Sequence, residues 1–231
     1  MVVEGGVFLE TLIVRASISP EKAQRMYDRL SWIYDCITAF ETVTVKKALS
    51  VAEVREGYTV LDVGFGTGRV LVELAKRVGR TGRVCGVDIS PKMCQKAKEK
   101  VKKNGFYERV DLKVGDARKL PCADNAFDLV FSSYMLDLID TPEIPHVLSE
   151  FKRVLKPGGK LVLVNMSKNK QGRTFYELIY SLGLGVGGCR PILAKPFLEK
   201  LGFQNVGRLY VDHLLYGSEI VWGNKPRTRP L

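Results

Sequence analysis

The stretch VLDVGFGTGRV, residues 60–70, decides the fold of this chain. A short apolar run, typical of a parallel strand that is buried on both faces, ends in a turn with glycines at 64, 66 and 68. The turn leads directly into the helical pattern RVLVELAKRVG, and glycine there lets a ligand lie against the backbone. Asp88 ends the next apolar run, where a βαβ unit places the carboxylate that binds a ribose diol. The stretch therefore predicts a nucleoside pocket.

The position of the third glycine discriminates between nucleoside ligands. Counted from Gly64 and Gly66, the dinucleotide fingerprint G-x-G-x-x-G/A requires a small residue at position 69. The chain has Arg69 there and places its third glycine at 68, in a D-x-G-x-G-x-G pattern that begins at Asp62. The spacing therefore argues against a dinucleotide such as NAD.

Length and cysteine usage bound the class of protein. With 231 residues, the chain has room for one α/β domain and a short extension. Its five cysteines are scattered, form no C-x-x-C pair and lie far from its two histidines, which argues against a disulfide framework and a zinc site. No apolar run approaches the roughly 18 residues of a membrane span, and the first residues lack the basic start of a signal peptide. We expect a soluble, cytoplasmic protein with no bound metal.

The formal net charge of +11 allows three interpretations: a solvated surface, a nucleic-acid partner or attraction to anionic lipid. Six lysines lie between residues 92 and 103, on a helix predicted to follow Asp88. No aromatic side chains alternate with them, as a surface that binds single-stranded nucleic acid would require. A solvated helix face is therefore favoured, and weak attraction to anionic membrane surfaces stays open.

Residues 1–50 are predicted to form a helical extension of a domain that spans residues 51–231. Apolar residues recur from Met26 to Ile37 at steps of four, three and four, which is one helical stripe. Tyr27 and Tyr34 lie beside this stripe, seven residues apart. Both rings either pack the helix onto the domain or take part in the site.

From the glycine turn onward, strand and helix patterns alternate as far as the strand KLVLVNM. Repeated βα units predict a parallel sheet with helices on both faces. The chain then ends in two β-rich runs, NVGRLYVDHLLY and SEIVWGNK, whose connection near Gly217 is too short for a parallel crossover. The sequence therefore predicts a doubly wound α/β fold with a seven-stranded, mostly parallel sheet that ends in an antiparallel hairpin.

Four motifs together resemble a known family. VLDVGFGTG, GVDIS, GDARKLPCADNAFDLVFSSYML and FKRVLKPGGKLVLV are similar, in order and spacing, to successive motifs of class I S-adenosylmethionine (SAM) methyltransferases. The similarity is to the small-molecule and quinone-lipid branch, which includes ubiquinone/menaquinone C-methyltransferases, and YDRLSWIYD resembles the lid helix of that branch. The resemblance implies a Rossmann-like methyltransferase fold and SAM as the cofactor.

The resemblance implies where each half of SAM would lie. The turn would lie under the methionine half, and it comprises Gly64, Phe65, Gly66, Thr67 and Gly68. Asp62 would help to hold the methionine ammonium group, and Asp88 would bind the ribose hydroxyls through charge-assisted hydrogen bonds.

The adenine base has its own predicted contacts. Ile89 and Met93 would sandwich the ring, to which a soft thioether is well suited. In GDARKL, the Asp116 carboxylate would accept a hydrogen bond from the adenine amino group, and the Ala117 amide would donate to a ring nitrogen.

The chemistry that the resemblance implies is an SN2 displacement at an activated methyl group. Alignment of nucleophile, methyl and sulfur can contribute roughly 7 to 11 kcal/mol. Ser132 would line the route to the methyl group. A base is needed only for a protonated acceptor; the candidates are Tyr134 and Asp137, plus the lid tyrosines Tyr27 and Tyr34. The region offers no histidine at the position where relatives often have one.

Evidence on the acceptor is mostly negative. The fourth strand ends in SSYM, which departs from the N/D-P-P-Y pattern of amide and adenine N-methyltransferases, so methylation of nucleic acid is not favoured. Residues 168–192 correspond to the acceptor roof of this branch, and their aromatic and aliphatic content suggests a small, hydrophobic or lipid-like acceptor. The alternative is a protein that binds SAM or nucleic acid without turning over a small molecule.

Overall fold

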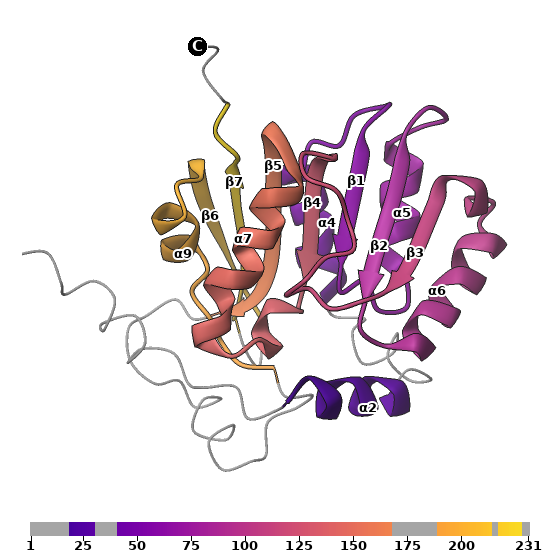
Figure 1. Cartoon of the computed structure of the whole chain (residues 1–231), viewed down its shortest axis with the longest axis horizontal. Coiled ribbons are helices and arrows are strands. Elements are labelled where there is room, and N and C mark those ends of the chain that lie inside the picture. Colours follow the sequence, from indigo (N-terminus) through magenta and orange to yellow (C-terminus); the bar gives the residue numbers. More distant parts are fainter. Residues whose placement is uncertain (1–18, 31–40, 168–188, 214–216, 228–231) are drawn as a thin grey trace, which may run out of the picture.

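The structure is a computed structural model that describes residues 19–30, 41–167, 189–213 and 217–227. A seven-stranded sheet forms its centre, with the strand order β3-β2-β1-β4-β5-β7-β6 (Figure 1). The strands are β1 (Thr59–Val63), β2 (Arg83–Asp88), β3 (Val110–Val114), β4 (Phe127–Ser133), β5 (Leu155–Ser167), β6 (Gln204–Asp212) and β7 (Gly217–Asn224). The first five strands pair in parallel, and β7 pairs antiparallel with both β5 and β6. The predicted parallel sheet with a terminal antiparallel hairpin is confirmed.

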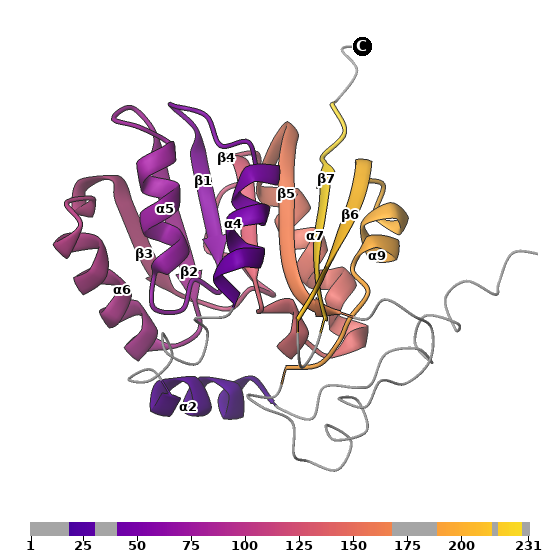
Figure 2. The ribbon, with the colours of Figure 1, turned by 180° about the vertical axis from the view of Figure 1, so that it is seen from behind.

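Helices cover both faces of the sheet. They are α2 (Pro20–Leu30), α4 (Thr42–Val51), α5 (Arg69–Arg77), α6 (Pro91–Lys103), α7 (Ile144–Val154) and α9 (Lys195–Lys200), with short 3-10 turns at Tyr107–Arg109, Leu136–Leu138 and Thr141–Glu143. Apolar side chains of α4, α5 and α6 share one core with one face of the sheet, and those of α7 and α9 share a second core with the other face. Seen from behind, α4 and α5 lie in front of the sheet and α7 lies behind it (Figure 2).

Strand β1 marks the point where the chain changes sides in the sheet. The chain proceeds from β1 outward through β2 and β3, and then returns to place β4 on the opposite side of β1. Val63 and Ser132 pair in register at the carboxyl ends of β1 and β4. Ligands of doubly wound sheets bind outside the carboxyl ends of the strands at such a switch point. The topology therefore locates the site before any side chain is considered.

Helix α2 lies across this carboxyl edge of the sheet, below the strands in both views (Figures 1 and 2). It contains the first part of the predicted lid motif, residues 27–30. The rest of that motif, including Tyr34, lies outside the described residues, as do residues 168–188 of the predicted acceptor roof. None of the helices in the described ranges has the length and apolar character needed to cross a membrane.

The turn between β1 and α5 depends on glycine for packing as well as for backbone conformation. Gly68 is the N-cap of α5 and has a φ of +83°. A Cβ atom at this position would lie 2.9 Å from the Cβ atom of Ala97 and 3.1 Å from its Cα atom. Ala97 belongs to α6, so the absence of a side chain at Gly68 allows α5 and α6 to approach each other.

We predict that Gly68→Ala destabilises the fold more than Gly105→Ala does. Gly105 also has a positive φ, +77°, but a Cβ atom there would meet nothing within 4 Å. Both variants place a side chain at a positive φ, which costs about 1 kcal/mol or more. Only Gly68→Ala adds a cost of about 1 to 3 kcal/mol for overpacking against α6. Urea unfolding of the two variants measures the difference, and equal losses would contradict this account of the helix contact.

Candidate functional site

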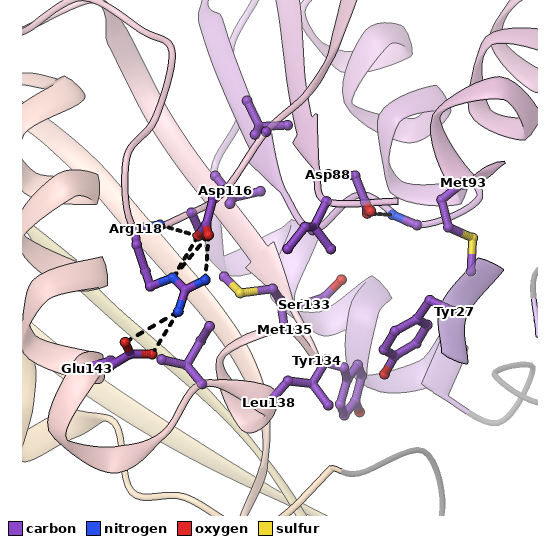
Figure 3. A pocket seen from close by; sticks show the side chains of 18 of the residues that line it. Tyr27, Asp88, Met93, Asp116, Arg118, Ser133, Tyr134, Met135, Leu138 and Glu143 are labelled. Atoms are coloured by element: carbon purple, nitrogen blue, oxygen red, sulfur yellow. Dashed lines mark hydrogen bonds and ion pairs between the residues drawn. The ribbon is translucent and has the colours of Figure 1, made fainter. Parts of the chain in front are cut away.

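A cavity of about 480 Å³ opens at the carboxyl edge of the sheet, between the ends of β1, β2 and β4 and the lid helix α2. The close-up shows side chains from these elements converging on it (Figure 3). The predicted site residues that line this cavity are Tyr27, Gly64, Gly66, Asp88, Ile89, Met93, Asp116, Ala117 and Tyr134. The structure thus brings together residues that are spread over more than 100 positions of the sequence.

Asp88 is held by two backbone amides at the end of β2. Its Oδ2 accepts a hydrogen bond from the Gly66 amide at 2.8 Å, and its Oδ1 accepts one from the Ser90 amide at 2.9 Å. Burial raises the pKa of Asp88 to about 6, although both amide hydrogen bonds act to lower it. Each carboxylate oxygen has a further lone pair. Asp88 can therefore accept two more hydrogen bonds from the cavity.

The glycine turn lies between two cavities, and its residues differ in which of them they line. Gly64 and Gly66 line the cavity, and a Cβ atom on Gly64 would lie 2.6 Å from the Met135 side chain. A second cavity of about 660 Å³, on the side of α4 and α5, is lined by Gly64, Phe65, Gly66 and Thr67. Phe65 and Thr67 therefore face only the second cavity, and Gly68 lines neither.

Asp62 does not line either cavity, although the resemblance assigns it to the methionine ammonium group. It is 1% exposed, and neither of its carboxylate oxygens has a hydrogen-bond partner among the described residues. Burial, followed by the negative charge of Asp88, raises its pKa well above the ordinary value for aspartate. A buried acid without a partner is rare and costs free energy, which is typical of a position that a ligand completes.

The end of the cavity formed by Gly115 to Arg118 contains an ion-pair chain that sequence reasoning missed. Arg118 donates from Nη2 to the Asp116 carboxylate at 2.5 Å and from Nη1 to the Glu143 carboxylate at 3.2 Å (Figure 3). Burial alone would raise the pKa of Asp116, but the hydrogen bonds from Arg118 outweigh it and the pKa is lowered. Asp116 is therefore an ionised acceptor at the cavity wall. Arg118 follows it by two residues, and that basic residue was the signal available in the sequence.

Ser132 lines neither cavity, although the resemblance places it on the route to the methyl group. It is 1% exposed, and its hydroxyl donates to the Val63 carbonyl at 2.8 Å. The next residue, Ser133, lines both cavities (Figure 3). Side chains alternate along a strand, so an error of one residue moves a side chain to the opposite face.

The two candidate bases at the end of β4, Tyr134 and Asp137, differ in position. Tyr134 lines both cavities, with a φ of +51°, but its hydroxyl shares a 2.9 Å hydrogen bond with the Ser218 hydroxyl. Burial raises the pKa of Tyr134, which makes its phenolate harder to form. Asp137 is fully buried and absent from the cavity lining, so its predicted position near the mouth is wrong. The 3-10 turn Leu136–Leu138 directs it inward, where it accepts a hydrogen bond from the Met166 amide at 2.8 Å.

The lid contributes Tyr27 to the cavity. Its ring extends from α2 toward the cavity in the close-up (Figure 3), and its hydroxyl is 3.8 Å from the Cys189 sulfur. Met93, at the start of α6, lies on the same side of the cavity. Rings and a thioether on the walls, with carboxylates at the margins, form a site for a flat heterocycle that carries a polar sugar.

Comparison with known proteins agrees with this geometry. Residues 60–159 match a family model described as a methyltransferase domain. The chain is 35% identical over 186 residues to a demethylmenaquinone methyltransferase of Bacillus cytotoxicus, which covers 78% of this chain and 76% of that protein. The chain belongs to the class I SAM-dependent methyltransferases. Its relatives place it in the small-molecule and quinone-lipid branch, and SAM is the cofactor of the family.

Two further comparisons are consistent with this membership. A demethylmenaquinone methyltransferase of Staphylococcus aureus is 39% identical over 153 residues, which is 64% of this chain and 61% of that protein. A solved SAM-dependent methyltransferase from Aquifex aeolicus is 27% identical, with a TM-score of 0.60, covering 90% of this chain and all of that chain. The chain thus spans between about half and three quarters of the length of the curated relatives that it matches.

The burial of Asp137 generates a prediction about stability. Burial raises its pKa well above the ordinary value, against the Met166 hydrogen bond and the charge of Arg190, which lower it. The folded state therefore holds the proton more tightly than the unfolded state, and this group favours folding below pH 4 and loses that contribution as pH rises. Asparagine does not titrate. From pH 4 to pH 7.5, the unfolding free energy of Asp137→Asn should therefore rise relative to that of wild type.

Chemical unfolding at the two pH values measures this shift. Asp111→Asn, on the exposed side of β3, is the matched control and should show no such relative gain. A wild-type advantage of Asp137 that grows with pH would contradict a raised pKa and restore this residue as an ionised candidate base.

Proposed function

We propose that this chain transfers the methyl group of SAM to a small, hydrophobic, quinol-like acceptor by SN2 displacement. The observation that carries the proposal is the cavity at the β1 switch point, where the Gly64 and Gly66 backbone and the Asp88 carboxylate meet. The relatives named demethylmenaquinone methyltransferase support the acceptor class. The alternative, binding of SAM or nucleic acid without turnover, has no comparable support.

The residues present fit SAM in chemistry as well as in position. The remaining lone pairs of Asp88 would accept from the two ribose hydroxyls, and Ile89 and Met93 would enclose adenine from the adjacent wall. The Ala117 amide and the Asp116 carboxylate would form hydrogen bonds with the edge of the adenine base. An ammonium group at the methionine end would favour the ionised form of buried Asp62, whose carboxylate oxygens have no hydrogen-bond partner among the described residues.

Alignment is the main contribution that this chain would make to the reaction. SAM supplies a methyl group that its sulfonium already activates, so the residues around the cavity need only orient donor and acceptor and exclude water. Of the candidate bases, neither Tyr134 nor Asp137 is well placed, because the Tyr134 hydroxyl is bonded to Ser218 and Asp137 is enclosed. We propose that Tyr134, Met135 and Leu138 form the apolar wall against which the acceptor lies.

The proposed role of Asp88 gives a pH-dependent binding prediction. Ribose hydroxyls donate to the ionised carboxylate, so binding of S-adenosylhomocysteine should be tight above pH 7 and should weaken as pH falls through about 6, the raised pKa of Asp88. Asp88→Asn removes the charge, which should weaken binding by about 10- to 100-fold at pH 7.5. It should also abolish the pH dependence near 6. Isothermal titration between pH 5 and pH 8 measures both, and an unchanged affinity in the variant would sink this assignment.

We also propose that the protein works in the cytoplasm, at the surface of a membrane that holds its acceptor. Lys22, Arg25 and Arg29 are exposed on α2, the helix that crosses the cavity mouth. Basic side chains near an anionic leaflet contribute about 1 kcal/mol each. Attraction at this place would bring the cavity mouth toward the lipid.

Methyl-labelled SAM and a demethylated quinol with an isoprenoid tail test both proposals in one assay. Wild type should label the quinol in detergent, and should do so faster when the quinol is held in vesicles with anionic rather than neutral lipid. Replacing Lys22, Arg25 and Arg29 with glutamine should remove the vesicle preference and leave the detergent rate unchanged.

The matched control replaces Lys98, Lys102 and Lys103, exposed lysines in the second half of α6, and so removes the same number of charges. It should keep the preference. No labelled quinol under any condition, together with labelled RNA from cell extract, would overturn the proposed acceptor class.

A further inference from the structure

The lid helix and the start of α6 meet at one serine. Ser90 is fully buried, and its hydroxyl donates to the Asp28 carboxylate of α2 at 2.5 Å. The same hydroxyl accepts a hydrogen bond from the Met93 amide at 3.0 Å and so caps α6. The Ser90 amide donates to Asp88 at 2.9 Å. Ser90 therefore joins the lid, the start of a helix and the carboxylate at the cavity.

This chain of hydrogen bonds continues to the glycine turn. Asp88 accepts from the Gly66 amide at 2.8 Å through its other oxygen. The path from the lid to the turn is thus Asp28, Ser90, Asp88 and Gly66, with a hydrogen bond at each step and no exposed residue along it. On the lid, Asp28 is the neighbour of Tyr27, which lines the cavity, so the bond to Asp28 also sets the position of that ring.

Electrostatics favour this arrangement and make it depend on whether the cavity is occupied. Asp28 also lies 3.4 Å from the Lys92 amide, so two carboxylates share the N-terminus of α6. A helix N-terminus stabilises negative charge, but the two carboxylates repel each other. Hydrogen bonds from a ribose to Asp88 would disperse its charge and reduce that repulsion. Occupation of the cavity and attachment of the lid should therefore favour each other.

We propose that Ser90 and Asp28 are positioning residues, a latch that couples binding of SAM to placement of α2 and Tyr27 over the cavity. The inference rests on the proposed function, because it takes SAM as the ligand of Asp88. Coupling of this kind is reciprocal: the ligand holds the lid, and the lid holds the ligand by the same factor. A ligand-free protein would keep a weaker lid contact, and loss of the latch would reduce affinity without removing any residue that touches SAM.

A double-mutant cycle in S-adenosylhomocysteine affinity tests the latch. Asp28→Ala should weaken binding about tenfold, because a hydrogen bond to a charged group is lost along with the placement of Tyr27. Ser90→Ala should weaken it at least as much, since it also removes the α6 cap. The double variant should be little worse than Ser90→Ala alone. Ser90→Thr retains a hydroxyl and should remain within about threefold of wild type.

The control is Glu21→Gln, which removes one negative charge from an exposed position of the same helix and should leave affinity unchanged. Amide hydrogen exchange of residues 21–30 provides a second measurement. With S-adenosylhomocysteine bound, exchange should be slowed in wild type and in Ser90→Thr but not in Asp28→Ala. If Ser90→Ala does not fold, Asp28→Ala and Ser90→Thr still decide the outcome through their affinity and their exchange.

Two negative results are distinguishable. Wild type that does not bind S-adenosylhomocysteine would overturn the proposed function and the latch together. Wild type that binds, with Asp28→Ala equal to it or with losses that multiply in the double variant, would overturn the latch alone, because the two side chains would then act independently.

Discussion

The hydrogen bond from the Gly66 amide to Asp88 is the interaction on which the rest of the site depends. It joins the β1-turn-α5 unit to the end of β2, two segments that meet only because their strands pair in parallel. Asp88 is buried, and burial raises its pKa to about 6, so an ionised carboxylate at this place destabilises the fold. Such a cost is typical of a binding site, where hydrogen bonds from the ligand offset it.

Burial acts on three carboxylates of this edge in different ways. Asp88 has two amide donors and faces the cavity. Asp62 has no hydrogen-bond partner within the described part of the chain. Arg118 lowers the pKa of Asp116 and keeps it ionised. Their environments therefore differ: Asp88 offers a polar contact for a sugar, Asp62 is a buried acid behind the turn whose pKa is raised, and Asp116 is an ionised acceptor at the cavity wall. The arrangement fits one ligand with a diol, an ammonium group and a heterocycle. Among the described residues, no group of side chains could hold a metal ion.

Some of these residues could be predicted because their signals are local. The turn glycines, Asp88 and the pair Ile89 and Met93 lie within or next to one strand-turn-helix unit, whose period and spacing define where side chains point. Ser132 lies inside β4, where an error of one residue selects the opposite face, and Asp137 lies beyond β4 in a 3-10 turn, where the strand alternation has stopped. The direction of a side chain beyond a strand end depends on what packs against it.

The sequence by itself determined the class of fold and the glycine turn of a nucleoside pocket, because apolar period, glycine spacing and an acidic residue at a strand end are short-range patterns. The cofactor followed from the resemblance of four successive motifs to a known family. The tertiary structure alone decided that Ser133 faces the cavity, that Arg118 bridges Asp116 and Glu143, and that Asp28 reaches Ser90 across 62 positions of the chain. These contacts join segments that are distant in sequence, and only packing brings them within hydrogen-bond distance.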